Sequence, residues 1–147
     1  MELLQLTRVE CLFCKIVARE TQAPVVWENA ATLVFLDHRP VFPGHCLLVP
    51  KVHCETLGDL AAESVEPLFG SARRLARAVE SGMQAEGTFV AINNRVSQSV
   101  PHLHVHVVPR NRKDGLRGFF WPRTKYASDE EMERARSAIA AAMAVEA

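Results

Sequence analysis

The sequence predicts an α+β fold in which one domain spans residues 1–147 around an antiparallel sheet. Short segments with the composition of strands follow one another through short turns, which is typical of antiparallel pairing. One long segment between them has helical periodicity. The chain has 147 residues, of which 48% are hydrophobic and 23% charged, and this composition suits a single hydrophobic core.

Three strands are predicted in the N-terminal half of the chain. They cover residues 25–27, 32–36 and 46–49, and turn residues at 28–29 and 40–44 separate them.

A long helix is predicted next. We expect Ser64 to cap its N-terminus, Pro67 to be tolerated in its first turn, and Gly82 to end it. Apolar residues recur at helical spacing along this segment: Val65, Leu68, Phe69, Ala72, Leu75, Ala76 and Val79.

Two further strands and a second helix complete the expected elements. The strands cover residues 87–93 and 103–108. The run Ser128-Asp129-Glu130-Glu131 has the pattern of a capping box, which predicts a helix from there through Met143. Residues 111–147 are less diagnostic, and we interpret them as a C-terminal extension of the same domain.

Three histidines alternate with aliphatic residues in the last predicted strand. Because successive side chains of a strand point to opposite faces, His102, His104 and His106 share one face. The other face, formed by Leu103, Val105 and Val107, has the pattern of a half-buried strand. We therefore expect the imidazoles to project toward a cleft or solvent. The alternative is a structural role for them, either in a metal cage or on a solvated face.

Imidazole can act as a neutral nucleophile, a general acid or base, or a metal ligand. Residues two apart on a strand lie roughly 6–7 Å apart, which leaves room for one phosphate group between neighbours. A neutral nitrogen avoids much of the repulsion that protects a phosphoanhydride from anionic nucleophiles. His104, the central residue, is the natural nucleophile. A zinc hydrolase with all three histidines as ligands around a bound water is a further alternative.

The chain resembles the histidine triad (HIT) nucleotide hydrolases and transferases. The resemblance rests on the segments 102–108, 97–101 and 43–53, and it extends over residues 11–110. It implies a five-strand antiparallel sheet with one long helix, and a homodimer whose sheets join into one ten-strand sheet. It also implies that His104 is the nucleophile and that His106 contacts the phosphate or the leaving group.

The histidine at position 106 favours the hydrolase branch of this family, because the phosphorylase and uridylyltransferase-like branches carry glutamine there. The predicted function is hydrolysis at the α-phosphate of a purine nucleotide, in a dinucleoside polyphosphate or a nucleoside phosphoramidate, through a covalent nucleotidyl-histidine. The alternative from another class is a zinc-stabilised nucleotide-binding module that regulates a partner without catalysis.

The predicted nucleotide site draws on several segments. The resemblance places Leu12 and Phe13 beside the base and Asp37 at the ribose hydroxyls. It favours phosphate contact for Gln98 and Ser99, and a turn could also aim their side chains there. Asn94 ends the preceding strand and could reach the phosphate, although asparagine is also common in turns. Likewise, Asp37 could simply cap a turn. We expect His45 to orient His104 through its second ring nitrogen.

Cys11 and Cys14 form a Cys-x-x-Cys pair, which suggests either redox activity or half of a zinc site. We expect no strand to lead into a helix that begins at this motif, and this weakens the redox interpretation. His53 and His102 would complete a Cys₂His₂ zinc site, as the resemblance to bacterial members of the family implies. Such zinc would be structural. The alternative is two unmetallated cysteines packed as small apolar groups.

Charge and hydropathy constrain the partners and the location. Seventeen basic residues balance 17 acidic ones, with a pI near 7.0, so no global field favours nucleic acid or a membrane surface. The chain has neither a signal-peptide pattern nor an apolar run of about 20 residues, and we expect a cytoplasmic protein. Residues 110–123 are basic and aromatic, and could contact nucleic acid, the distal part of a substrate or a dimer partner.

Overall fold

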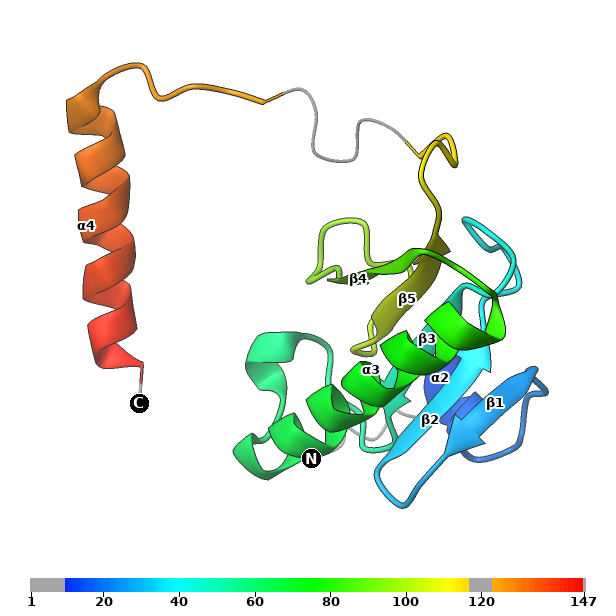
Figure 1. The fold of residues 1–147 in the computed structure, drawn as a ribbon. Coiled ribbons are helices and arrows are strands. Elements are labelled where there is room, and N and C mark those ends of the chain that lie inside the picture. Colours follow the sequence, from blue (N-terminus) through cyan, green and yellow to red (C-terminus); the bar gives the residue numbers. More distant parts are fainter. Residues whose placement is uncertain (1–9, 117–122, 147) are drawn as a thin grey trace. The chain divides into compact units, whose positions relative to one another are not determined.

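The computed structural model describes residues 10–116 and 123–146 (Figure 1). The chain divides into two units, residues 1–114 and residues 115–147. The boundary lies close to residue 111, where we began the extension, and the assignment of both parts to one domain stays a prediction.

A five-stranded antiparallel sheet forms the centre of the first unit, and it confirms the predicted α+β class. The strands lie in the order β1-β2-β3-β5-β4, so β5 is internal and β1 and β4 are the edges. Their bounds are Val25–Glu28 (β1), Thr32–Leu36 (β2), Cys46–Pro50 (β3), Gly87–Ile92 (β4) and Val105–Arg110 (β5).

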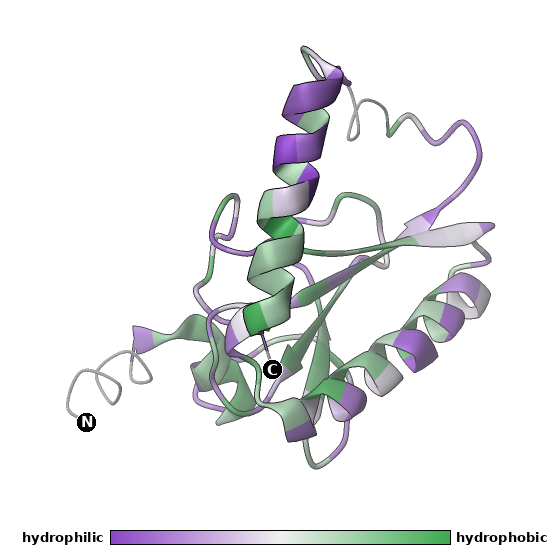
Figure 2. Ribbon diagram, turned by 90° about the vertical axis from the view of Figure 1, so that its left-hand side faces the viewer, coloured by the Kyte–Doolittle hydropathy of each residue, from purple (hydrophilic) through white to green (hydrophobic). Residues whose placement is uncertain are grey.

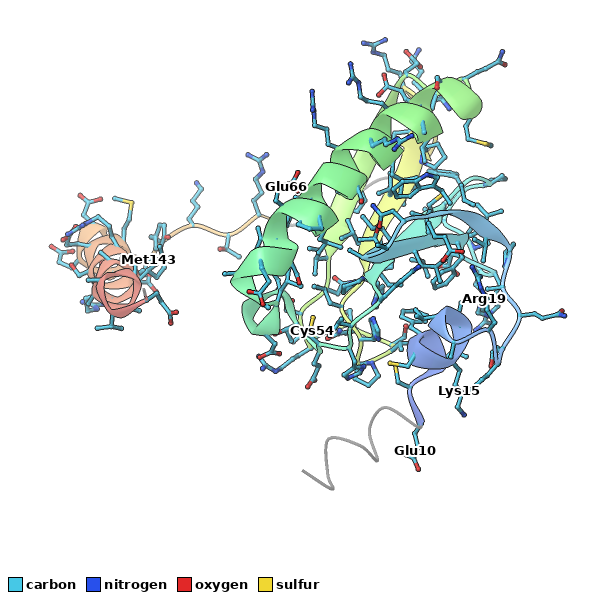
Figure 3. All side chains as sticks on the ribbon, turned by 90° about the horizontal axis from the view of Figure 1, so that it is seen from below. Glu10, Lys15, Arg19, Cys54, Glu66 and Met143 are labelled. Carbon is cyan, nitrogen blue, oxygen red and sulfur yellow. The ribbon has the colours of Figure 1, made fainter. Side chains whose placement is uncertain are left out.

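Two helices cover opposite faces of this sheet (Figures 1 and 3). Helix α3 (Ala62–Gly82) packs on one face, where Leu68, Leu75 and Leu103 are part of the larger core cluster. The short helix α2 (Leu12–Val17) lies on the other face, where Phe13 and Phe35 belong to a second cluster. In Figure 2 the strands are mainly hydrophobic, whereas α3 changes repeatedly between hydrophobic and hydrophilic positions. Both faces of the internal strands are therefore buried.

The predicted starts of two elements are wrong. Helix α3 begins at Ala62 with Ala61 as its cap, and the amide of Ser64 already bonds to the Ala61 carbonyl at 2.9 Å. Ser64 is therefore not the cap, and Pro67 lies inside the helix rather than in its first turn. Strand β5 begins at Val105 rather than Leu103, because the Leu103 amide bonds to the Cys54 carbonyl at 2.7 Å instead of to a strand.

Helix α2 was not predicted, and it begins at the Cys-x-x-Cys motif; residues 1–9, where a strand leading into it would lie, are outside the described ranges. Cys11 is its N-cap, and the Cys11 thiol accepts a hydrogen bond from the Cys14 amide at 3.4 Å. With six residues, the helix is too short to give a recognisable hydrophobic period. A short 3-10 turn, η1 (Leu57–Asp59), precedes α3.

The second unit contains helix α4 (Asp129–Val145). The Ser128 side chain accepts a hydrogen bond from the Glu131 amide at 3.1 Å, as the capping-box pattern predicted. The helix continues two residues beyond the predicted end at Met143. None of the helices in the described ranges combines the length and the apolar character needed to cross a bilayer.

Candidate active site

A cavity of about 300 Å³ lies on the α2 side of the sheet. It brings together six of the residues singled out from the sequence: Leu12, Phe13, Asp37, Ser99, His104 and His106. They belong to four segments that are distant in the sequence: α2, the end of β2, the loop before the histidine triad and the start of β5. The fold brings these segments together at one site. The volume is at the lower end of the range for small-ligand pockets.

His45 reaches this region through a tight turn. Gly44 has φ +95°, a conformation that side chains rarely adopt, and a Cβ there would lie 2.7 Å from the Met83 side chain. The turn closes with a hydrogen bond from the His45 amide to the Phe42 carbonyl. Glycine at position 44 therefore places His45 directly before β3.

The protonation of the His104 ring follows from its neighbour. Nδ1 lies 2.7 Å from the His102 carbonyl oxygen, which can only accept a hydrogen bond, so Nδ1 carries the proton. The neutral ring then holds its lone pair on Nε2. The Phe13 ring packs edge-on against this imidazole at 5.1 Å between centroids. His104 is therefore fixed in orientation, with its nucleophilic nitrogen defined by the backbone.

His45 and His106 form a second oriented pair. The Val41 amide donates to Nδ1 of His45 at 3.1 Å, so the proton of a neutral His45 ring is on Nε2. Nε2 of His45 in turn donates to Nδ1 of His106 at 3.0 Å. His106 must then carry its proton on Nε2, which is buried and has no partner in the described part of the chain. His45 therefore contacts His106, and not His104 as we expected.

The imidazole rings of His45, His104 and His106 are neutral at neutral pH. Burial lowers the pKa of His45 and of His104, and the nearby Asp37 carboxylate opposes this effect in both. The pKa of His106 falls to about 4, chiefly through burial and also through repulsion by His104 and His45. At neutral pH the site thus offers a lone pair on His104 and an N–H donor on His106.

The triad is more enclosed than its sequence pattern suggested. His102 and His104 are buried at 0% and 4% exposure, so the expectation that all three histidines face a cleft or solvent is wrong for His102. The reason is α2, whose Phe13 ring contacts both imidazoles. The predicted buried face of the triad segment is confirmed, because Leu103, Val105 and Val107 are all fully buried in the core under α3.

Asp37 lines the cavity, and one of its carboxylate oxygens accepts a hydrogen bond. Oδ1 accepts a hydrogen bond from the Arg39 amide at 2.9 Å, which is the turn-capping arrangement we considered. Oδ2 lies 3.8 Å from Nε2 of His45. The carboxylate therefore has a turn role and still faces the cavity.

Asn94 and Gln98 are not among the residues that line the cavity. The Asn94 side chain accepts from the Leu57 amide at 2.9 Å. Gln98 accepts from the Arg95 amide at 2.8 Å and donates to the Glu55 carbonyl at 2.7 Å. These amides join two loops, and their expected phosphate contacts stay a prediction.

Ten of the cavity residues were not predicted as site residues, and four of these are consecutive in the sequence: Thr21, Gln22, Ala23 and Pro24. They connect α2 to β1 and contain no recognisable motif. They reach the site because the β1 edge pairs with β2, whose end carries Asp37. Only the strand order reveals this proximity.

Cys11, Cys14, His53 and His102 form a compact cluster of potential metal ligands. Three sulfur-to-nitrogen distances, from Cys11 to His102 and from Cys14 to His53 and His102, lie between 3.3 and 3.5 Å. The Nδ1 atoms of His53 and His102 are 3.2 Å apart. Around tetrahedral zinc with the usual bond lengths, a sulfur and a nitrogen ligand lie about 3.5 Å apart, and two nitrogen ligands lie about 3.3 Å apart. Nε2 of His102 donates to the Pro50 carbonyl at 2.8 Å, which leaves its Nδ1 lone pair toward the cluster. The residues therefore fit a closed Cys₂His₂ metal site.

The basic and aromatic segment 110–123 is described only in part, since residues 117–122 lie outside the described ranges. Arg110 pairs with Asp114, and Arg112 pairs with Glu86. These two cations are thus neutralised locally, which weakens the nucleic-acid interpretation of the segment.

Comparison with protein families matches residues 18–113 to the HIT domain. A protein named hit from Bacillus subtilis is 33% identical over 139 residues, which cover 91% of this chain and 94% of that protein. An adenosine 5'-monophosphoramidase from Schizosaccharomyces pombe is 31% identical over 124 residues, or 83% of this chain and 90% of that enzyme.

Solved structures agree with the fold. A Streptococcus mutans protein superposes with a TM-score of 0.81 at 30% identity, covering 91% of this chain and 85% of that one. A zinc-bound histidine triad family protein from Mycobacterium smegmatis superposes with a TM-score of 0.71 at 35% identity, covering 95% of this chain and 99% of that one.

Proposed function

Because the chain belongs to the HIT domain family, we propose that it is a nucleotide hydrolase. The bond cleaved is a phosphoanhydride or phosphoramidate at the α-phosphate of a purine nucleotide. One observation carries this proposal: the hydrogen bonds of the site give His104 a lone pair and His106 a proton on their Nε2 atoms, and both residues line one cavity.

The two imidazoles have complementary roles in the first step. Nε2 of His104 attacks the α-phosphorus and forms a phosphorus–nitrogen bond, while the bond from phosphorus to the leaving group breaks. The Nε2–H of His106 donates a hydrogen bond to the departing oxygen or nitrogen, which takes any proton it needs from solvent, so His106 stays neutral. In the second step, water attacks the nucleotidyl-histidine, the phosphorus–nitrogen bond breaks, and the attacking water releases a proton to solvent. The net reaction is hydrolysis.

Substrate recognition follows from the walls of the cavity. Leu12, Phe13 and Ile16 offer an apolar surface for the flat face of a base. Asp37 retains an oxygen able to accept from a ribose hydroxyl, and the exposed Ser99 hydroxyl can donate to a phosphate oxygen. The likeness to an adenosine 5'-monophosphoramidase supports a purine nucleotide as substrate.

We also propose that Cys11, Cys14, His53 and His102 hold structural zinc. The fit of their separations supports this assignment, as does the zinc-bound Mycobacterium smegmatis relative. Zinc would supply a crosslink between the start of α2 and the loop that carries the triad. The ligands on α2 flank Phe13, so the crosslink would also hold the wall of the nucleotide cavity.

A homodimer in the cytoplasm completes the proposal. Val65 and Phe69 on α3 and Val90 on the edge strand β4 are 42%, 43% and 47% exposed, which supports an interface involving both elements. None of the four cysteines forms a disulfide, which is consistent with a reducing compartment. Sedimentation of the wild type and Phe69→Glu variant would test the dimer, and two equal molecular masses would contradict this interface.

The catalytic proposal is tested by rapid quenching and intact-mass measurement. Wild type and His104→Ala are mixed with adenosine phosphoramidate and, separately, with a diadenosine polyphosphate. An added AMP mass confined to the wild type supports the nucleotidyl-histidine and ranks the substrates. If neither substrate is consumed while AMP still binds, the protein is instead a nucleotide-binding module.

A further inference from the structure

A second concave surface lies between α3 and the β1–β2 turn, on the opposite side of the sheet from α2. It encloses about 660 Å³. Six of the residues lining it carry the argument: Trp27, Asn29, Glu66, Arg73, Arg74 and Arg77. We call this surface the arginine groove. Glu66, labelled on α3 in Figure 3, is the only acidic residue among the described residues that line it.

The three arginines of the groove differ from several other cations of the chain. Arg19, Arg110, Arg112 and Arg136 each pair with a carboxylate. By contrast, none of the groove arginines has a carboxylate within ion-pair distance among the residues that the structure describes. Three guanidinium groups against one carboxylate leave a local excess of positive charge on a chain with no net charge. The groove therefore favours an anionic ligand.

The donors in the groove are partly preorganised. The Arg74 guanidinium lies over the Trp27 ring, 5.0 Å from its centroid, and this contact restricts the long side chain before any ligand binds. The Asn29 side-chain oxygen accepts from the Ala31 and Thr32 amides. Its NH₂ group is thereby left as the end that can donate to a ligand.

We propose that the arginine groove binds a small ligand bearing two or more phosphate groups. Guanidinium forks match phosphate oxygens in bidentate geometry, and Arg74 and Arg77 are one helical turn apart on the same side of α3. The volume of the groove lies within the range for small-ligand pockets. The absence of net charge argues against a nucleic acid, which depends on an extended positive field.

The groove is separate from the nucleotide cavity, because none of its lining residues belongs to that cavity. Around the helix, Phe69 on the proposed dimer face lies about 140° from Arg74, about 80° from Arg77 and about 40° from Arg73, so Arg74 is the groove arginine farthest from that face. Binding in the arginine groove can therefore be measured independently of catalysis.

Trp27 provides the readout. The experiment uses full-length protein with Trp121→Phe, so that Trp27 is the one remaining tryptophan of the two in the sequence. Inorganic tripolyphosphate is titrated at low salt with saturating AMP present, which fills the nucleotide cavity. We expect a saturable change in Trp27 emission, weakened by added salt because the contacts are ionic.

Matched variants identify the site. Arg74→Gln and Arg77→Gln should each raise the Kd for tripolyphosphate about ten-fold or more, the effect of losing one charge-assisted hydrogen bond. Arg77→Gln leaves the contact between Arg74 and Trp27 in place, so its Kd is measured by the same fluorescence signal. The Kd of Arg74→Gln is measured by calorimetry. Arg112→Gln removes an exposed arginine of the same unit that does not line the groove and should leave the Kd unchanged.

Two results would overturn the proposal. One is an equal response of the wild type, the groove variants and the Arg112→Gln control, which would mean nonspecific screening. The other is tighter binding of a single-stranded oligonucleotide than of tripolyphosphate, with the same dependence on Arg77, which would make the groove a nucleic-acid surface. Hydrolysis of the nucleotide substrate should remain unchanged in Arg77→Gln.

Discussion

His45 donates a hydrogen bond from Nε2 to Nδ1 of His106 over 3.0 Å, and the Val41 amide fixes the direction of that bond by occupying the other nitrogen of His45. The proton on the far nitrogen of His106 is therefore set by a backbone group outside the cavity. His45 does not line the cavity in the described part of the chain. It is a positioning residue that acts through His106.

Replacing His45 tests this positioning role. In His45→Leu the His106 ring can adopt either tautomer, so we expect kcat to fall about 100-fold while AMP affinity changes little. His45→Gln keeps an N–H donor near the same place and should recover part of kcat. Steady-state kinetics and AMP titration check both effects. Equal loss in the two variants would show that His45 serves packing alone.

Acid should destabilise the protein through His106. Its folded-state pKa is about 4 against an ordinary value of 6.5, so the unfolded chain takes up the proton first as the pH falls. The contribution of the neutral ring is thus complete above pH 6.5 and is lost progressively toward pH 4. At about 1.4 kcal/mol per pKa unit, we expect wild type to lose about 2 kcal/mol more than His106→Gln between pH 7 and 4.5.

Urea unfolding of both proteins across this pH range provides the measurement. The histidines that do not contact His106 are present in both, so their titration cancels in the difference, whereas His45 and His104 interact with His106 and contribute to it. Parallel pH profiles would mean that His106 accepts a proton as readily in the folded as in the unfolded state.

Asp37→Asn separates the two uses of this side chain. The amide oxygen can still accept from the Arg39 amide, so the turn is retained, but one acceptor and the charge are lost. We expect wild type to bind AMP about ten-fold more tightly than 2',3'-dideoxy-AMP, and the variant to bind both nucleotides equally. Calorimetry with each nucleotide measures the difference. If the variant keeps the full preference, another group recognises the ribose.

The alternation of residues in the triad segment was sufficient to predict its buried aliphatic face. Leu103, Val105 and Val107 are fully buried, because the period of two in a strand is a local property. The environment of the histidines is not local. Phe13 covers them from a six-residue helix about 90 positions earlier in the chain, and no period in that short segment predicts the contact.

The partner of His45 was beyond sequence reasoning for a related reason. Strand register places Leu47 opposite His106, so His45, two residues earlier on the same face, lies diagonal to His106. Composition identifies both strands but gives no register between them. The convergence of Asp37, Phe13 and His104 on one cavity, in contrast, agrees with the sequence-based grouping of these residues.

Metal removal distinguishes structural zinc from catalytic zinc. A strong chelator should lower the Tm by about 5–10 °C, since the cluster joins α2 to the triad loop. Below that Tm, His104 should still form the nucleotidyl adduct, because its lone pair is set by the His102 carbonyl and not by a metal. Cys14→Ser should lower the bound metal measured by atomic emission, whereas Cys46→Ser, a buried cysteine outside the cluster, should retain it. Loss of adduct formation in chelated protein that is still folded would instead favour a zinc hydrolase, in which the metal supplies the attacking water.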